Sequence, residues 1–249
     1  MILTIDAGNT SITCGIFDQD RLVSKFRIPS DINRDFVEVF RRKIFPTKIS
    51  GAIISSVVEE LDDRLCCAVE KVCGIKPVML SYNSNMPVTL KLENNSEIGA
   101  DRIANGVRAW NLYKKAVIVV DFGTAITFDI VNSKGEFIGG LIAPGLKTQF
   151  DSLGKATSKL PDIGIDYIEK VIGNNTRDAI LAGVVRGTAA MIDGMLKQSV
   201  DELGENPVII ATGGFCEIVA KYMDEKFDLI SHDFTIEGLF DLYKINKDL

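Results

Sequence analysis

The sequence predicts an α/β protein built from two similar lobes. The first observation is an internal repeat, because ILTIDAGNTSITCGIF near the start resembles AVIVVDFGTAITFDIV near the middle. In each copy an apolar strand reaches an acid, Asp6 or Asp121, a polar turn with glycine follows, and an alternating strand returns. The second observation is that short apolar runs alternate with helical patterns elsewhere. A duplicated hairpin followed by αβ units predicts two lobes with a cleft between them.

The repeat divides the chain near residue 115 and sets the expected domains at 1–115 and 116–249. A chance likeness of two hairpins is the alternative, but the matched Asp-x-Gly turns favour duplication. Helical spacing of apolar residues predicts helices, and short apolar runs predict strands. The expected strands are 51–58, 78–81 and 208–211, and the expected helices are 59–73, 98–114 and 178–203.

Composition and charge narrow the class of protein. The chain has 249 residues, of which 46% are hydrophobic, so it can bury a sizeable core. Its net charge of -6 argues against nucleic acid or an anionic membrane as a partner. No basic region precedes the first apolar stretch, Asp6 interrupts that stretch, and we find no run of about 18 apolar residues. We therefore expect a cytoplasmic protein.

Cysteine and histidine usage restricts the chemistry. The five cysteines form no Cys-x-x-Cys pair, so we expect reduced and mostly buried thiols. His232 is the only histidine in the sequence, which argues against Ser-His, Cys-His and multi-histidine zinc sites. Any general base is therefore expected to be a carboxylate. The cysteines are Cys14, Cys66, Cys67, Cys73 and Cys216.

The turn that follows Asp6 has the character of an anion site. Gly8 lets the backbone approach a ligand closely, and successive turn N–H groups form a concavity that favours anions. A carboxylate beside a phosphate site commonly handles Mg²⁺, often through water. An ordinary hairpin turn is the alternative interpretation. Repetition at Asp121–Thr124 favours two turns that hold a polyphosphate from both sides.

The helix expected at 98–114 carries a polar face. Asp101, Asn105 and Arg108 lie on this face at spacings of four and three residues. Asp101 falls near the start of the helix, where an acid is favoured by the helix dipole alone, so an ordinary acid and a functional acid remain equally open. The opposite face carries Ile103, Val107 and Trp110, which suit packing.

Two glycine-bearing segments of the second half are further candidates. Thr212–Phe215 follows a buried strand and precedes a helix, where an adenosine could lie against the backbone; a plain strand-to-helix turn is the alternative. Glycine inside a helix lowers its stability, so small residues that recur on the helix expected at 178–203 suggest that another element packs closely against it. This element could belong to the same chain or to a second copy, and we favour the second copy. These small residues are Gly183, Gly187, Ala190 and Gly194.

Together these stretches resemble the type III pantothenate kinase family, and the matches run through the whole chain in order. The resemblance implies duplicated ribonuclease-H-like lobes, as in acetate and sugar kinases, actin and chaperone ATPases. The matching stretches are Asp6-Ala-Gly-Asn-Thr10, Ile54-Ser-Ser-Val57, Gly99-Ala-Asp-Arg102, Asp121-Phe-Gly-Thr-Ala125 with Thr127, Ala143-Pro-Gly145, Lys159-Leu-Pro161, Asn175-Thr176 and Ala211-Thr-Gly-Gly214.

The resemblance implies ATP-dependent phosphorylation of pantothenate, the first step of coenzyme A synthesis, by a homodimer. It makes Asp101 the general base, Asp121 the ligand of a monovalent cation (K⁺ or NH₄⁺), and Asp6 a ligand of Mg²⁺ through water. The N-terminal lobe would then hold the phosphate hairpin and catalytic helix, and the C-terminal lobe the cation site, dimer helix and adenosine-side loop. The implied ATP contacts are Asp6, Ala7, Gly8, Asn9, Thr10, Ser11, Ile12, Thr13 and Thr124. The implied pantothenate contacts are Gly99, Ala100, Asp101, Arg102 and Thr176.

Two alternatives stay open beside the enzyme. One is a non-catalytic regulatory relative, against which Asp6 and Asp101 are both intact. The other is a kinase of the same fold with a different small alcohol as acceptor. The Gly-Ala-Asp-Arg stretch argues against it. The position near Leu92 leaves it open, because many family members carry a pantothenate-contacting tyrosine there.

Overall fold

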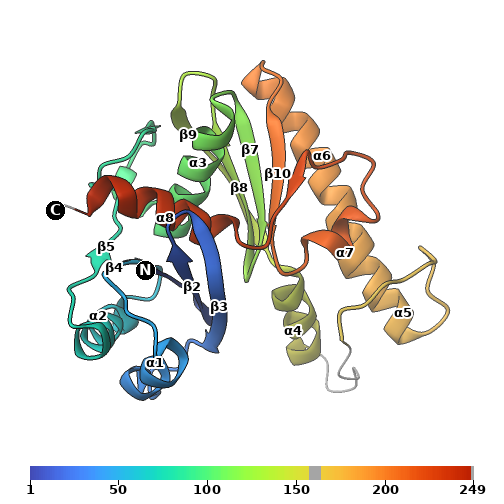
Figure 1. Cartoon of the computed structure of the whole chain (residues 1–249). Coiled ribbons are helices and arrows are strands. Elements are labelled where there is room, and N and C mark those ends of the chain that lie inside the picture. Colours follow the sequence, from blue (N-terminus) through green and yellow to red (C-terminus); the bar gives the residue numbers. More distant parts are fainter. Residues whose placement is uncertain (157–163, 248–249) are drawn as a thin grey trace. The chain divides into compact units, whose positions relative to one another are not determined.

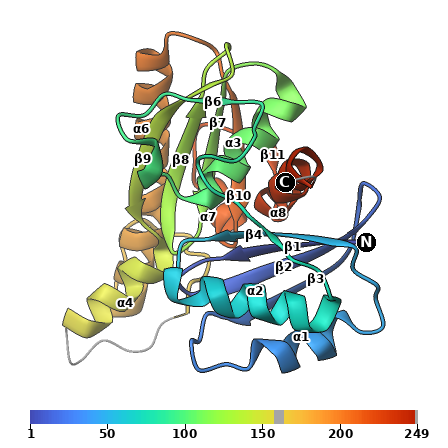
Figure 2. The same cartoon turned by 90° about the vertical axis from the view of Figure 1, so that its left-hand side faces the viewer.

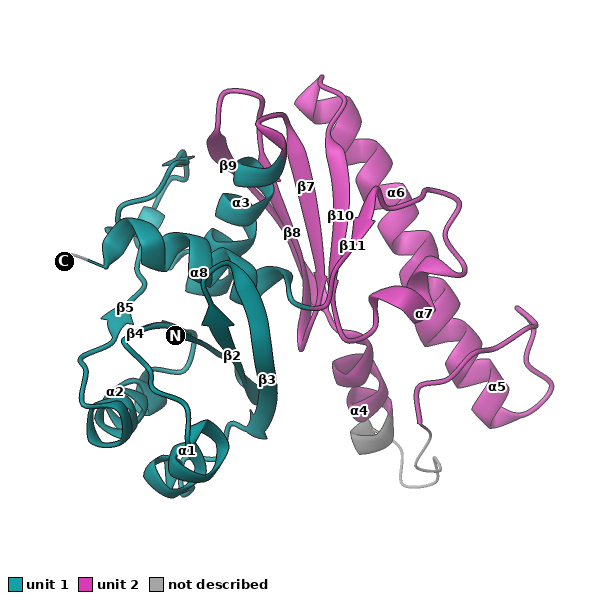
Figure 3. Cartoon of the chain, in the orientation of Figure 1, with its two compact units in different colours: residues 1–112, 233–249 teal, residues 113–232 magenta. Residues whose placement is uncertain are grey.

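The computed structural model describes residues 1–156 and 164–247, with side chains omitted over 154–156. The quoted stretch Lys159-Leu-Pro161 lies outside the described residues. The chain divides into two compact units, Met1–Leu112 with Asp233–Leu249 as unit 1, and Tyr113–His232 as unit 2 (Figure 3). Both units are α/β, as the sequence predicts (Figure 1).

Unit 1 is a sheet of strand order β3-β2-β1-β4-β5. Its helices α1 and α2 cover one face, where Leu3 and Ile5 enter the core, and α8 lies against the other face (Figure 2). Its strands are β1 (Ile2–Ala7), β2 (Ser11–Asp18), β3 (Arg21–Pro29), β4 (Gly51–Ser56) and β5 (Val78–Met79). The short β6 (Thr89–Leu90) follows in the same segment of the chain but is not part of this sheet. The helices are α1 (Phe36–Ile44), α2 (Glu59–Cys73), η1 (Asn95–Glu97), α3 (Ala100–Tyr113) and α8 (Phe234–Asn246).

The five strands that unit 2 contributes to its sheet repeat this plan in the order β9-β8-β7-β10-β11. The alternate residues Ile118, Val120 and Phe122 of its central strand enter a core to which the long helix also contributes. The strands are β7 (Val117–Phe122), β8 (Ala125–Val131), β9 (Glu136–Pro144), β10 (Val208–Gly213) and β11 (Leu229–Ile230). The helices are α4 (Leu146–Ala156), α5 (Thr176–Leu181), η2 (Ala182–Arg186), α6 (Gly187–Leu203) and α7 (Cys216–Ala220).

The two sheets confirm the duplication. In each unit the first three strands are antiparallel neighbours, the fourth pairs in parallel with the first, and the fifth pairs in parallel with the fourth. The acids occupy the same place, since Asp6 pairs with Thr13 across its hairpin and Asp121 pairs with Thr127. The turn of the first hairpin is one residue longer, but in both hairpins the acid ends up opposite a threonine, and the order and direction of all five strands match, which favours duplication over a chance likeness.

The expected domain boundary needs correction at the C-terminus. The chain enters unit 2 close to the expected position, but it returns, and residues 233–249 pack in unit 1 rather than with the second lobe. The reason is that α8 buries its apolar residues against β1 and β4. The residues involved include Phe234, Leu239 and Leu242. The sequence repeat indicates where the second lobe begins, but it carries no information about which lobe α8 packs against.

The long helix formed by α5, η2 and α6 runs from Thr176 to Leu203. Its length and hydropathy alone would suffice to cross a membrane. One face, however, is part of the unit 2 core, which is the position of a core helix. The core residues on this face include Leu181, Val185, Ile192 and Leu196.

Candidate active site

The turn after Asp6 is a tight hairpin whose acid is oriented by a neighbouring strand. Gly8 N–H donates to Ser11 O at 3.1 Å and closes the turn. Ser55 lies beside Asp6 in parallel β4 and donates its hydroxyl to Asp6 Oδ1 at 3.2 Å. Since Ser55 is fully buried, its hydroxyl holds the carboxylate in a fixed direction at the carboxyl end of β1.

Strand β3 fixes the same turn from the other side. Ser30 donates its hydroxyl to Gly8 O at 2.5 Å and its backbone N–H to Thr10 O at 3.2 Å. Arg27 Nε donates to Ser11 Oγ at 2.6 Å. Our reading of the sequence missed Ser30 and Arg27; the available signal was the polar turn at 18–20, which returns β3 alongside β2. The turn is therefore preorganised before any ligand binds.

Asp101 lies in the first turn of α3, and Gly99 makes room for its carboxylate. Asp101 Oδ1 accepts the Arg102 backbone N–H at 2.8 Å. A Cβ placed on Gly99 would come within 2.4 Å of the same oxygen, so any larger residue would push the carboxylate away. Burial raises the pKa of Asp101, and the Arg102 N–H and guanidinium offset this only in part. A raised pKa makes this carboxylate a stronger base than an exposed aspartate.

The turn after Asp6 and the start of α3 meet at one end of the unit 1 sheet. Val57 follows β4 and donates its backbone N–H to Ala7 O at 3.1 Å. The same residue borders Gly99, because a Cβ there would lie 3.4 Å from Val57 Cγ1. Val57 thus links the candidate phosphate turn to the candidate base at the carboxyl ends of two parallel strands, the usual place for ligands in α/β sheets.

In unit 2, Asp121 lies beside the end of β10, whose last residue is Gly213. Thr212 is its parallel neighbour, and a Cβ on Gly213 would come within 2.7 Å of Asp121 Oδ1. Gly213 has φ of +91°, a conformation that favours glycine. A carboxylate oxygen has the donor chemistry that a hard cation prefers.

The loop at Gly213 is held by the only histidine and by a buried cysteine. Gly213 O lies 3.1 Å from Cys216 Sγ, which donates to it, and 3.1 Å from His232 Nδ1. Burial raises the pKa of Cys216 to about 11, so its thiol keeps the donated proton at neutral pH. His232 contacts the Gly213 carbonyl, a structural role that the sequence did not indicate.

The five cysteines are free thiols; Cys14 and Cys216 are buried, while the other three are only partly buried, which corrects the expectation that most are buried.

The remaining candidates of unit 2 occupy exposed positions. Thr124 is exposed, and its carbonyl accepts the Gly145 N–H at 3.0 Å and the Thr148 hydroxyl at 2.7 Å. This explains the Ala143-Pro-Gly145 stretch, which brings α4 against the turn. Thr176 is exposed at the first position of α5, whose N-cap Asn175 accepts the Asp178 N–H at 2.9 Å. The structure thus assigns Asp6 and Asp101 to unit 1, and Asp121, Thr124 and Thr176 to unit 2.

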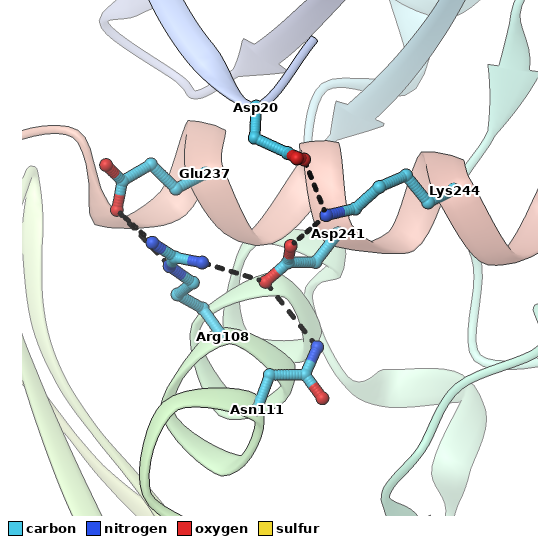
Figure 4. Close-up of polar contacts among 6 residues, drawn as sticks. All are labelled: Asp20, Arg108, Asn111, Glu237, Asp241 and Lys244. Atoms are coloured by element: carbon cyan, nitrogen blue, oxygen red, sulfur yellow. Dashed lines mark hydrogen bonds and ion pairs between the residues drawn. The ribbon is translucent and has the colours of Figure 1, made fainter.

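Among the described residues, neither a cluster of metal ligands nor the cavity beside α8 coincides with the candidate active site. Within residues 1–156 and 164–247, no three His, Cys, Asp or Glu side chains are grouped to hold a metal ion. A cation at Asp6 would therefore take its other ligands from water and substrate oxygens, as Mg²⁺ commonly does. Unit 1 has a cavity of about 360 Å³ on the side of α8, and neither Asp6 nor Asp101 lines it. Its polar walls include Asp20, Arg108, Asp241 and Lys244 (Figure 4).

Comparison with solved structures defines the class of fold. The ethanolamine utilization protein EutJ from Carboxydothermus hydrogenoformans matches with a TM-score of 0.58 and 16% identity, over 95% of this chain and 88% of that one. The activator of the 2-hydroxyisocaproyl-CoA dehydratase from Clostridium difficile, solved with bound ADPNP, matches with a TM-score of 0.55 and 10% identity, over 100% and 97%. The chain therefore has the two-lobed, ribonuclease-H-like fold of the actin-like ATPases and kinases.

Sequence comparison then gives the family. The family model for type III pantothenate kinase matches residues 2–198. A type III pantothenate kinase from Persephonella marina is 35% identical, over 98% of this chain and 98% of that protein. Another from Citrifermentans bemidjiense is 36% identical, over 99% and 100%. The chain belongs to the type III pantothenate kinase family.

Proposed function

We propose that the protein transfers the γ-phosphoryl group of ATP to the hydroxyl of pantothenate, forming 4'-phosphopantothenate in the first step of coenzyme A synthesis. The observation that carries the proposal is that Val57 contacts both Ala7, just before the candidate phosphate turn, and Gly99, two residues before Asp101, in a chain of this family. Phosphoryl transfer requires positioning and charge neutralisation more than covalent help, and two fixed carboxylates beside an amide-rich turn suit it.

In this proposal the segment from Asp6 to Thr13 holds the ATP phosphates. Its backbone N–H groups and hydroxyls donate to phosphate oxygens, and contacts from β3 and β4 keep the turn in place. Asp6 would hold Mg²⁺ through water; when bound, this ion neutralises charge on the phosphates. The exposed Thr124 is a further proposed ATP contact, and the loop that begins at Gly213 is the proposed adenosine side.

Asp101 is the proposed general base. The raised pKa of Asp101 suits removal of the proton from the acceptor hydroxyl. Asp101 lies at the start of α3, at the end of the unit 1 sheet where the hairpin turn after Asp6 also lies. Gly99, Ala100 and Arg102 would bind pantothenate, with the Arg102 guanidinium suited to the substrate carboxylate. Thr176 would be a further pantothenate contact.

Asp121 is the proposed ligand of a monovalent cation. The absence of a side chain at Gly213, which leaves space beside the Asp121 carboxylate, supports this proposal. If K⁺ binds there, activity should fall when K⁺ is replaced by Na⁺, and Asp121→Asn should lower kcat by about tenfold or more, since a bound cation is often the largest local charge in a site. Steady-state rates in K⁺, NH₄⁺ and Na⁺ measure both effects. Wild-type rates that do not depend on the cation would remove this role from Asp121.

A homodimer in the cytoplasm completes the proposal. The small residues Gly183, Gly187 and Gly194 are exposed, and a Cβ added at any of them would meet nothing within 4 Å among the described residues. No neighbour within the described chain therefore accounts for these glycines, which supports close approach by a second copy. Size-exclusion chromatography with light scattering measures the oligomeric state directly.

The acceptor is tested by an assay that follows ADP release with several alcohols in parallel. Pantothenate should be preferred, and other small alcohols should support slower turnover. Strong preference for another alcohol would favour the same-fold alternative, for which Leu92 is the relevant position. ATP binding without turnover of any acceptor would favour the non-catalytic alternative.

A further inference from the structure

The C-terminal helix α8 contacts α3 along one stripe that points toward Asp101. Thr235 donates its hydroxyl to Asn105 Oδ1 at 2.9 Å, one helical turn from Asp101. Asn105 is buried, so the face that the sequence indicated as polar is partly an interface between two helices. The position of α3 therefore depends on a segment more than a hundred residues away in sequence.

Backbone contact sets the spacing of the two helices. Gly238 of α8 faces Ala104 of α3, and a Cβ on Gly238 would come within 2.2 Å of Ala104 O and 3.2 Å of Arg108 Cβ. Such a distance to backbone cannot be relieved by turning a side chain, so a residue larger than glycine at 238 must displace one helix from the other. Ala104 is three residues from Asp101.

An ion-pair network holds the other end of the stripe (Figure 4). Arg108 of α3 contacts Glu237 and Asp241 of α8, each at 3.1 Å. Asp241 is almost buried and also contacts Lys244 at 3.0 Å, so its charge is balanced by two cations. Lys244 in turn contacts Asp20 of the β2–β3 turn at 3.4 Å. The network ties the contact between α3 and α8 to the sheet whose central strand carries Asp6.

We propose that Thr235 and Gly238 are positioning residues for the catalytic carboxylate: Gly238 sets how closely α3 packs on α8, and Thr235 fixes the turn of α3 next to Asp101 through Asn105. The inference rests on the proposed role of Asp101 as general base. Neither residue touches the substrate in this account, and both act by placing the Asp101 carboxylate. Placement matters because a shift of about 1 Å in a reacting group can cost about a hundredfold in rate.

The test compares Gly238→Ala with Gly164→Ala in the full-length protein. Gly164 is an exposed glycine at which a Cβ meets nothing within 4 Å among the described residues, so it controls for the change itself. Gly238→Ala should lower kcat by about tenfold or more and leave the KM for ATP within about twofold. It should also move the acid limb of the kcat–pH profile to lower pH, because displacement of α3 relieves the burial that raises the pKa of Asp101. A purely structural glycine would not move that limb.

Thr235 provides a second pair of variants, Thr235→Val and Thr235→Ser. Unlike Gly238→Ala, neither variant adds an atom at the close contact between the two helices. Thr235→Val removes the hydroxyl at nearly constant shape and should lower kcat severalfold, whereas Thr235→Ser keeps the hydroxyl and should retain the wild-type kcat. Thermal unfolding of all variants shows whether each is folded. Wild-type kcat and an unmoved acid limb in folded Gly238→Ala and Thr235→Val would overturn the inference. If the wild type itself turned over no acceptor, the proposed function would fail instead.

Discussion

Asp101→Asn should lower kcat by about a thousandfold while leaving ATP binding nearly unchanged. A positioned general base contributes roughly 10²–10⁴ to rate, and an amide of the same shape cannot accept the hydroxyl proton. The side chain still fits over Gly99, so the start of α3 keeps its place. Single-turnover measurements of phosphoryl transfer, with ATP affinity from calorimetry, separate chemistry from binding. Near wild-type turnover would remove Asp101 from the role of base.

The same substitution should stabilise the protein at neutral pH. Because burial raises the pKa of Asp101 in the folded chain, ionising this group costs more in the folded than in the unfolded protein. Its contribution to folding stability is therefore fully present below the ordinary aspartate pKa and is lost as the pH rises through the raised value. Asparagine has no such pH dependence. Thermal unfolding of wild type and Asp101→Asn should show a gap at neutral pH that narrows as the pH falls, and a gap of opposite sign would contradict the assigned burial effect.

Asp6→Asn is the second substitution with a large expected effect. Loss of the carboxylate removes the proposed ligand of the Mg²⁺–phosphate complex, so kcat/KM for ATP should fall by about a hundredfold or more. The dependence on Mg²⁺ should shift to higher concentrations. Ser55→Ala is a graded companion, because it removes only the hydroxyl that orients Asp6 and should cost less. Initial rates over a matrix of ATP and Mg²⁺ concentrations measure both variants. Equal losses in the two would contradict the assignment of Ser55 as a supporting group.

The repeat allowed much of the fold to be predicted from sequence. Two-residue periodicity and Asp-x-Gly turns sufficed for the hairpins of Asp6 and Asp121, in which each acid pairs with a threonine of the returning strand. The helix expected at 59–73 is α2 with those bounds, since Gly74 ends it in a left-handed conformation. These features depend on local pattern alone, so the sequence displays them directly.

The supporting contacts of the site could not be predicted, because they join distant segments. Ser30 reaches the turn after Asp6 only through the register of β3, and Thr235 reaches Asn105 only after α8 returns to unit 1. His232 likewise gains its role from a loop carbonyl at Gly213. Spacing along the chain carries no information about such pairings, which tertiary packing decides.

The most direct test of the account is identification of the product by mass spectrometry after incubation with ATP, Mg²⁺, K⁺ and pantothenate. Wild-type protein should form a compound heavier than pantothenate by one phosphoryl group, in amounts equal to the ADP released. The Asp101→Asn variant, still binding ATP, should form almost none. ADP release by the wild type with pantothenate left unmodified would contradict the central claim that this protein is a pantothenate kinase.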